Sequence, residues 1–370
     1  MTQTAAGRAL VREATPREIA AWDELVTQFT NHRLVHRAAW IRSLERSGVG
    51  QPLWLVFEYN GDVAGCLPGL LVRLGPIRLF GSPLEGWQTV SLGPAFDPAR
   101  LTTADMMRTL VPYLEHRHGV HHVELMSRDL DPTDMVAAGF RECHVVTYRG
   151  PMRVDDPAAT LRAFKESARR NVRRAEKLGL VVQFEDDESF VDEHYDQLCE
   201  VYARNGVVVP FGKRRVLECF RQMRAAGHLI AVSVRLPQTA TCIATGMFFQ
   251  DGRELLLWTW THRTRYRWYR ATELMTWTVM QRAMAAGCTS IDFMGGGDFK
   301  AKLGGEPELS KSRWIRSRYR WLTAARSAAA HGYRWQQALR GRLGQLRLAI
   351  ADRLPGNGGR SDLPAHEAGA

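Results

Sequence analysis

The chain has 370 residues, of which 45% are hydrophobic and 24% are charged, and its formal net charge is +11. These values are typical of a soluble globular protein, and the length favours two domains over one. The basic charge favours anionic partners, namely phosphate-bearing cofactors, nucleic acid or an acidic membrane surface, without choosing among them. No apolar run is long enough to span a bilayer, and the N-terminus lacks the apolar core of a signal peptide. We therefore expect a cytoplasmic protein, with peripheral attachment at the inner face of the membrane as an alternative.

The six cysteines are scattered singly along the chain, without a C-x-x-C pair or the spacing of a zinc finger. This distribution favours free thiols in a reducing compartment over a disulfide framework. Four histidines gather between residues 116 and 122, but no cysteine or carboxylate at ligand spacing accompanies them. We therefore expect no metal site.

The first half of the chain contains helices, then a hairpin, then a further helix and strand. Thr15, Pro16 and Glu18 have the pattern of a helix start. The Asn60-Gly61 dipeptide is typical of a tight hairpin turn between two strands. The predicted elements are strands at 8–13, 52–59, 63–72, 77–80 and 120–126 and helices at 15–27, 38–47 and 102–117. Together they predict a mixed α+β domain over residues 1–150.

The second half repeats this order of elements without residue-level similarity to the first. Residues 161–178 are predicted to form one helix with an apolar stripe, closed by Gly179. The rest of its surface is strongly basic, which fits either a solvated face or a site for an anionic ligand. The later elements are a helix ending near 203, helices at 213–226 and 271–286, and strands at 180–184, 228–236, 242–250, 254–261, 290–293 and 312–319. They predict a second domain over residues 151–320.

The strand at 290–293 runs directly into three consecutive glycines at 295–297. Glycine lets a backbone adopt positive φ or approach a ligand closely. Asp292 stands near the strand end, and an aromatic residue and a lysine, Phe299 and Lys300, follow the glycines. The pattern is that of the lip of a binding site or, equally, of an ordinary strand–turn–helix connection.

Four short stretches, in their order and spacing, resemble a known family. They are the hairpin at 61–68, the arginine-rich helix at 169–180, the strand end at 291–296 and the Asp-Phe-Lys element at 298–300 with Leu303-Gly304 behind it. The chain resembles the GNAT acyltransferase fold used twice in tandem, and in particular the FemAB-like and CelD-like acyltransferases. The resemblance implies two tandem GNAT-like domains, each a twisted, mostly antiparallel sheet flanked by helices. It also implies acyl transfer by direct attack in a ternary complex, without a covalent enzyme intermediate.

The pyrophosphate loop that is usual in GNAT proteins is absent, and residues 267–272 stand in its place. Arg270, Ala271 and Thr272 still offer a cation and a helix start to a phosphate. The resemblance implies acyl-CoA, such as acetyl-CoA, as the donor substrate. Some members of the group use aminoacyl-tRNA, so tRNA remains an alternative partner that also suits the basic surface.

The resemblance also places the reacting groups. Asp292 is expected to act as the base or to orient the acceptor, and Lys300 to stabilise negative charge at the acyl centre or on a phosphate. The residues expected to bind substrate are Phe299, Gly295, Gly296, Trp260 and Arg169. The plain alternatives are a carboxylate paired with an arginine at 292 and a surface lysine at 300.

Residues 321–370 are expected to form a basic helical extension and a disordered tail. From Arg313 to the end of the chain there are eleven arginines, no lysine and three acidic residues. Apolar residues recur at helical spacing as far as Leu354, where Pro355 and several glycines follow. Such a helix either lies on an anionic membrane or packs on the protein.

The function predicted first is a monomeric N- or O-acyltransferase. Its acceptor would be an amine or hydroxyl of a cell-envelope or polysaccharide-related molecule, either a small molecule or a glycan or peptide precursor. One alternative is transfer of an amino acid from aminoacyl-tRNA, as in the formation of peptidoglycan bridges. The other is a non-catalytic, basic scaffold at a membrane.

Overall fold

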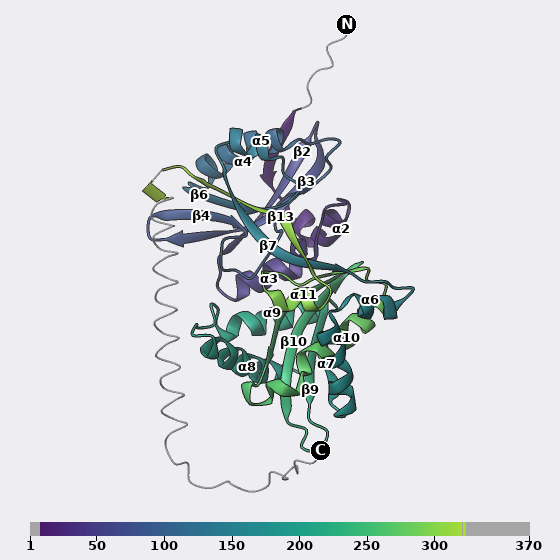
Figure 1. Ribbon diagram of the computed structural model, residues 1–370. Helices are drawn as coiled ribbons and strands as arrows, with labels where there is room; N and C mark the ends of the chain where they lie inside the picture. The colour runs from purple at the N-terminus through teal and green to yellow at the C-terminus, as the bar shows by residue number, and fades with distance from the viewer. Residues whose placement is uncertain (1–7, 320, 323–370) are drawn as a thin grey trace, which may run out of the picture.

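The computed structural model shown in Figure 1 describes residues 8–319 and 321–322. Its centre is one mixed sheet of 13 strands. The strands are β1 (Ala9–Glu13), β2 (Gln51–Tyr59), β3 (Asp62–Leu74), β4 (Ile77–Ser82), β5 (Ala95–Phe96), β6 (His122–Met126), β7 (Arg141–Pro151), β8 (Val181–Glu185), β9 (Leu229–Arg235), β10 (Cys242–Asp251), β11 (Glu254–His262), β12 (Ser290–Asp292) and β13 (Glu306–Ser317). Across the sheet the order is β1-β2-β3-β4-β6-β13-β7-β12-β11-β10-β9-β8, and β5 pairs with β3. Within the described residues the parallel neighbours are β4 with β6 and β11 with β12.

Helices cover both faces of this sheet. They are α1 (Pro16–Ala20), α2 (Trp22–Thr27), α3 (Ala38–Arg46), α4 (Thr103–Arg117), α5 (Pro132–Ala137), α6 (Pro157–Ala163), α7 (Glu166–Lys177), α8 (Phe190–Arg204), α9 (Lys213–Ala225), α10 (Ala271–Ala285) and α11 (Asp298–Lys302), with 3-10 helices η1 (Leu34–His36) and η2 (Thr264–Tyr269). In the second half, α7 and α10 bury apolar residues against one face of the sheet, and α8 and α9 against the other. The mixed α+β class predicted from the sequence is confirmed.

Two local patterns form as the sequence predicts. The Thr15 hydroxyl accepts a hydrogen bond from the Glu18 amide, and the Glu18 carboxylate accepts one from the Thr15 amide. This reciprocal capping box satisfies amides that the first turn of α1 leaves without partners. In the turn between β2 and β3, Asn60 and Gly61 both have positive φ, at 54° and 91°. That conformation is the reason why the Asn-Gly pair is typical of two-residue hairpins.

The single helix predicted over residues 161–178 is instead two helices, separated at Phe164. Phe164 has an extended backbone, because its ring is buried against Trp277 of α10 with the ring centroids 5.9 Å apart. Arg169 of α7 turns back toward this break and donates hydrogen bonds to the carbonyls of Arg162 and Phe164, at 2.8 and 2.7 Å. Carbonyls at a helix end lack partners within the helix, so Arg169 caps the C-terminus of α6.

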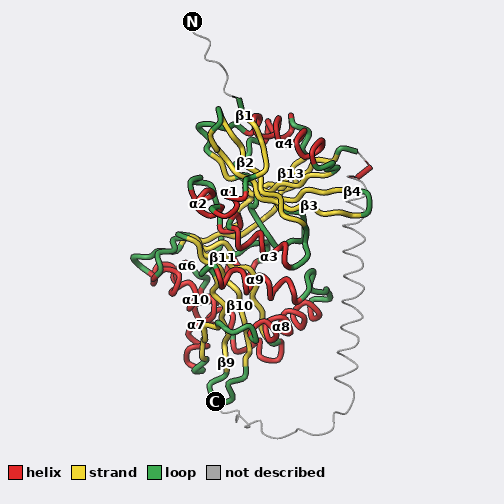
Figure 2. The backbone as a smooth tube through the Cα atoms, turned by 180° about the vertical axis from the view of Figure 1, so that it is seen from behind, coloured by secondary structure: helices red, strands yellow, loops and turns green. Residues whose placement is uncertain are grey.

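The last strand crosses from the second half of the chain into the first. It was predicted at 312–319 within the second domain, but β13 begins at Glu306 and lies between β6 and β7. Trp314, for example, pairs with Leu125 on one side and with Glu142 on the other. The sheet is therefore continuous through both halves, as Figure 2 shows.

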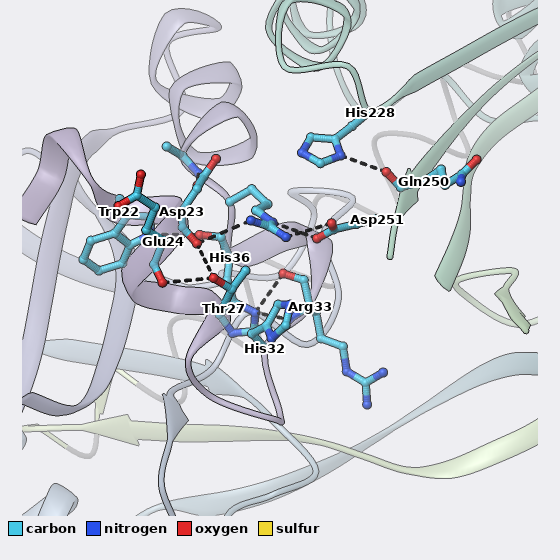
Figure 3. Close-up of polar contacts among 12 residues, drawn as sticks. Trp22, Asp23, Glu24, Thr27, His32, Arg33, His36, His228, Gln250 and Asp251 are labelled. Carbon is cyan, nitrogen blue, oxygen red and sulfur yellow. Dashed lines mark hydrogen bonds and ion pairs between the residues drawn. The ribbon is translucent and has the colours of Figure 1, made fainter. Parts of the chain in front are cut away.

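The two halves also share a hydrophobic core and ion pairs. Trp40 of α3 packs edge-on against Phe249 of β10, with ring centroids 5.6 Å apart, in a cluster drawn from both halves. Arg37 binds both carboxylate oxygens of Asp251 at 2.8 Å. Figure 3 shows Asp251 reaching into the first-half residues around His36. Such two-point ion pairs and aromatic contacts fix how the halves sit against each other.

The division of the chain at residues 150 and 320 stays a prediction. The basic extension predicted for residues 321–370 lies outside the described residues, apart from Trp321 and Leu322. Among the described helices, none is both long enough and apolar enough to cross a membrane. The six cysteines are all described, and they are free thiols as predicted.

Candidate active site

A cavity of about 470 Å³ lies at the C-terminal end of β11. Its walls come from α8, from η2 and the start of α10, and from the glycine loop and α11 that follow β12. The predicted site residues that line it are Trp260, Arg270, Ala271, Thr272, Gly296, Phe299 and Lys300. The helix start and the glycine loop, which are separated by the length of α10 in the chain, thus meet in one place.

One part of the cavity wall is cationic. Arg267 and Arg270 are exposed there, on η2 and at the residue before α10. Arg270 has φ of 60°, in the left-handed region, and its side chain makes no capping hydrogen bond to the helix. In the first turn the carboxylate of Glu273 accepts a hydrogen bond from its own backbone amide. The first amides of a helix have no partner within the helix and carry partial positive charge. Two guanidinium groups and a helix start at one place form a suitable site for a phosphate or another anion.

Another part of the cavity wall is formed by Lys300 and two aromatic rings. The Lys300 ammonium donates hydrogen bonds to the carbonyls of Met294 and Gly295, the latter at 2.8 Å. Burial lowers the pKa of Lys300 to about 8, because the charged form loses hydration, although the charge of Asp292 opposes this shift. The Phe299 ring meets Trp260 edge-on with centroids 5.2 Å apart, which gives this end an apolar wall.

The loop between β12 and α11 contains glycines in conformations that favour glycine. Gly297 has φ of 136°, a region that residues with a Cβ atom rarely adopt. Gly295 does not line the cavity, but a Cβ atom there would lie 3.6 Å from Nζ of Lys300. The loop therefore holds its carbonyls where Lys300 can bind them.

Asp292 lies away from the cavity. It is 4% exposed, and its Oδ1 accepts a hydrogen bond from the Met294 amide at 2.7 Å. A separate hollow of about 10 Å³ beside it is also lined by Arg33 and Glu254, at the junction of the two halves. The charge of Asp292 raises the pKa of Lys300, which does line the cavity.

Arg169, the remaining predicted site residue, does not line the cavity either. Its guanidinium is engaged with the end of α6, as described above. Arg169 therefore has a structural role at the junction of α6 and α7. The exposed basic residues of α7 form a separate surface. They are Arg170, Arg173, Arg174 and Lys177.

Several cavity residues were missed from the sequence. Glu273 is buried in the first turn of α10, and His262 ends β11 with its Nε2 atom 3.3 Å from Nη1 of Arg204. Burial, followed by the Arg204 charge, lowers the pKa of His262. Thr261 also lines the cavity, with a buried hydroxyl that has no hydrogen-bond partner in the described residues. None of these residues belongs to a sequence motif. An acidic residue in the first turn of a helix, such as Glu273, is usually explained by its favourable interaction with the helix dipole.

Residues 162–303 match a family described as acetyltransferase (GNAT) domain. Every residue that lines the cavity falls within this range. The chain contains a GNAT acyltransferase domain. It is therefore an enzyme of this kind, and the resemblance recognised in the sequence is confirmed. No curated protein matches the chain.

Solved structures with the fold of this GNAT protein span both halves of the chain. FemX has a TM-score of 0.66 at 13% identity, over 83% of this chain and 97% of FemX. A tandem GNAT protein from the clavulanic acid biosynthesis pathway has a TM-score of 0.52 at 13% identity, over 85% of this chain and 99% of its own. L-PGS from Bacillus licheniformis has a TM-score of 0.50 at 12% identity, over 90% and 97%. These likenesses show the fold, and they extend it beyond the GNAT domain to the first half.

Within the described residues, neither the GNAT domain nor the first half gathers His, Cys, Asp or Glu side chains in a group that could hold a metal ion. The charged and titratable side chains that line the cavity are those of Arg204, Arg267, Arg270, Lys300, His262 and Glu273.

Proposed function

We propose that the GNAT domain transfers an acyl group from an activated donor to an amine or hydroxyl, with both substrates held in the cavity beside β11. The observation that carries this proposal is that a cationic helix start and Lys300 line the same cavity. The helix start suits the phosphates of a donor. Lys300 suits the negative charge that develops on a carbonyl oxygen when a nucleophile attacks it.

Acyl-CoA is the proposed donor. Arg267, Arg270 and the start of α10 would hold its phosphates, in place of the usual pyrophosphate loop. The unpartnered hydroxyl of Thr261 supports a polar ligand in the cavity, because buried polar groups in proteins normally have a hydrogen-bond partner. The residues present thus fit a chain that carries amides and ends in phosphates.

Lys300 would stabilise the developing oxyanion. An ammonium has three N–H donors, and the carbonyls of Met294 and Gly295 take two of them. With a pKa of about 8, roughly nine-tenths of the lysine is charged at pH 7. Asp292 supports this charge from outside the cavity, so we propose it as a positioning residue that acts through Lys300.

Aminoacyl-tRNA is the second candidate donor, favoured by the surface of α7 and η2. Exposed Arg170, Arg173 and Arg174 lie on α7, and Arg174 sits over the exposed ring of Trp268 at 5.9 Å. Basic side chains beside an exposed aromatic ring suit a nucleic-acid backbone and an unstacked base. The likeness to FemX and to L-PGS supports this candidate as well.

Isothermal titration of the full chain with acetyl-CoA, alanyl-tRNA and uncharged tRNA tests the two donors. If acyl-CoA is the donor, acetyl-CoA binds and Arg270→Ala weakens it by about tenfold to a hundredfold, the worth of one charge-assisted hydrogen bond. Arg282→Ala is the matched control, since Arg282 lies at the opposite end of α10, outside the cavity, over Phe184. Binding of alanyl-tRNA alone would select the second donor, and binding of neither would reject acyl transfer.

A further inference from the structure

A second cavity, of about 350 Å³, lies in the first half of the chain, outside the GNAT domain. It is bounded by the end of β1, the start of β2, the β3–β4 hairpin and the end of α4. This first-half cavity shares no lining residue with the cavity beside β11 in the GNAT domain (the GNAT cavity). Figure 1 shows β4 and α4 in the upper part of the view and α10, which begins at the GNAT cavity, in the lower part. The proposed acyl transfer leaves the first-half cavity without a role.

The register of the strands brings two arginines together in the first-half cavity. Arg73 of β3 lies directly opposite Arg78 of β4, and two residues away Leu71 lies opposite Phe80. Side chains two residues apart in a strand share a face of the sheet, so both arginines lie on the face where Phe80 packs in one cluster with α4. Two like charges directly opposite each other on neighbouring strands destabilise a sheet.

A third guanidinium in the wall comes from Arg117, the last residue of α4. Within the described residues, none of these three arginines forms an ion pair with an acidic side chain, whereas Arg12 binds Glu18 and Arg37 binds Asp251. A basic residue at the end of a helix is favoured by the helix dipole, but the dipole does not account for the arginine pair on the strands. The three arginines therefore lack a counter-ion.

Arg78 and His118 connect the arginines to the end of α4. Nη1 of Arg78 donates a hydrogen bond of 2.9 Å to the carbonyl of His118, which holds the guanidinium at the cavity. Nε2 of His118 is buried 3.5 Å from Oε1 of Glu13 and has no hydrogen-bond partner in the described residues. Among the described residues that line this cavity, Glu13 is the one acid, so the guanidinium groups leave an excess of positive charge.

Much of the remaining wall of the first-half cavity is apolar. It contains Pro52 and Leu53 of β2 and Leu71 and Val72 of β3. Sites for small molecules typically combine apolar walls with a few convergent charged groups, and the volume of this cavity lies at the lower end of their range. A bare inorganic anion would leave the apolar wall unused.

We propose that the first-half cavity binds an organic phosphate, in which a phosphate group is joined to an apolar body. The phosphate would lie against Arg73, Arg78 and Arg117, because a guanidinium presents N–H donors in a geometry that phosphate oxygens accept. Its negative charge offsets the repulsion between the paired arginines. The apolar body covers Leu71 and Val72 and so removes apolar surface from water. A soluble phosphate ester and a phospholipid in a membrane surface share this chemistry.

Isothermal titration of the full chain at about pH 8 with octyl phosphate, inorganic phosphate and octyl glucoside tests the site. Octyl phosphate should bind about tenfold more tightly than inorganic phosphate, or better, because its chain buries apolar surface. Octyl glucoside has the same chain without a charge and should not bind. Arg73→Gln should weaken the binding of octyl phosphate by about tenfold to a hundredfold, the contribution of one charge-assisted hydrogen bond. Because this change removes a like-charge pair, the midpoint of thermal unfolding should not fall, which separates lost binding from misfolding.

Two control variants separate this site from other basic surfaces. Arg42→Gln removes the same charge from the exposed side of α3, outside the cavity, and should leave the affinity for octyl phosphate unchanged. Arg270→Ala alters the proposed phosphate site of the GNAT cavity and should leave the binding that depends on Arg73 unchanged. Binding that Arg270→Ala weakens and Arg73→Gln does not would place the anion in the GNAT cavity and overturn the inference. Equal affinities for octyl phosphate and inorganic phosphate, or no binding, would overturn it as well.

Co-sedimentation with vesicles separates the two sources of the ligand. Phosphatidylcholine vesicles that contain phosphatidic acid present the phosphate in a bilayer, and pure phosphatidylcholine vesicles are the control. If the ligand is a lipid, the full chain co-sediments with the first kind, and Arg73→Gln weakens this association by about tenfold. If octyl phosphate binds but Arg73→Gln leaves co-sedimentation as it was, the ligand is a soluble phosphate ester. None of these measurements depends on acyl transfer, so their failure bears on this site alone.

Discussion

Replacing Lys300 by methionine should change how the stability of the protein depends on pH. The pKa of Lys300 falls from an ordinary value of 10.5 to about 8, chiefly because burial disfavours the ammonium. Between these two values the unfolded chain binds a proton at Lys300 that the folded protein does not, so the free energy of unfolding rises with pH. The slope for one proton is about 1.4 kcal/mol per pH unit. Over the whole interval the lysine therefore contributes a rise of about 3 kcal/mol.

Urea unfolding of the wild type and of Lys300→Met between pH 7 and pH 10 measures this contribution. The two proteins are compared at each pH, so that the contributions of the other titrating groups to the free energy of unfolding cancel. As the pH rises above 8, we expect the free energy of unfolding of the wild type to increase by about 2 to 3 kcal/mol relative to that of Lys300→Met. Lys177→Met, in the exposed last turn of α7, should show no such trend. A difference between wild type and Lys300→Met that stays constant over this range would refute the argument from burial.

Deprotonation of Lys300 should also lower the rate of acyl transfer, because only the charged ammonium stabilises the oxyanion. Acyl transfer by the wild type should fall about tenfold for each pH unit above the pKa of Lys300. Lys300→Arg keeps a positive charge throughout this range, so its lower activity should show no such decline. Lys300→Met should lose about a hundredfold to a thousandfold in kcat at neutral pH.

Two further substitutions test residues outside the cavity. Arg169→Ala removes the cap of α6 and should lower the free energy of unfolding by about 1 to 2 kcal/mol in urea titrations. The affinity for the donor should not change. A loss of donor binding of similar size would show that Arg169 belongs to the binding site after all. Arg215 is 5% exposed between Trp40 and Trp258, with a hydrogen bond to Ser43 but with Nε and Nη2 unpartnered in the described residues. Arg215→Met should therefore leave the free energy of unfolding unchanged or raise it by about 1 to 3 kcal/mol, and a fall of that size would show that the buried cation stabilises the fold.

The sequence predicts most clearly those features that depend on neighbours in the chain. The capping box at Thr15 and the Asn60-Gly61 turn are complete within a few residues, so their patterns are sufficient. Phe299 and Lys300 follow three glycines in the chain, which is also a local pattern, and both line the cavity.

The features that the sequence does not predict depend on contacts between distant segments. Phe164 interrupts a helix because Trp277, more than a hundred residues later, buries its ring. Asp292 is near the end of the right strand, yet the tertiary structure leaves it outside the cavity and puts Glu273 in the cavity wall. No local pattern shows which acidic residue of a strand end or helix start is buried beside a ligand site.

The position of β13 has a consequence for the synthesis of the protein on the ribosome. β6 and β7 both depend on β13 as a neighbour, although β13 follows β6 by about 180 residues in the chain. At the usual rates of translation, this strand emerges on the order of 10 to 40 s after β6. Until then, the edges of β6 and β7 that β13 will cover lack their partner, and such edges readily pair with other chains. The first half of the nascent protein should therefore need a chaperone until nearly all of the described chain has been made.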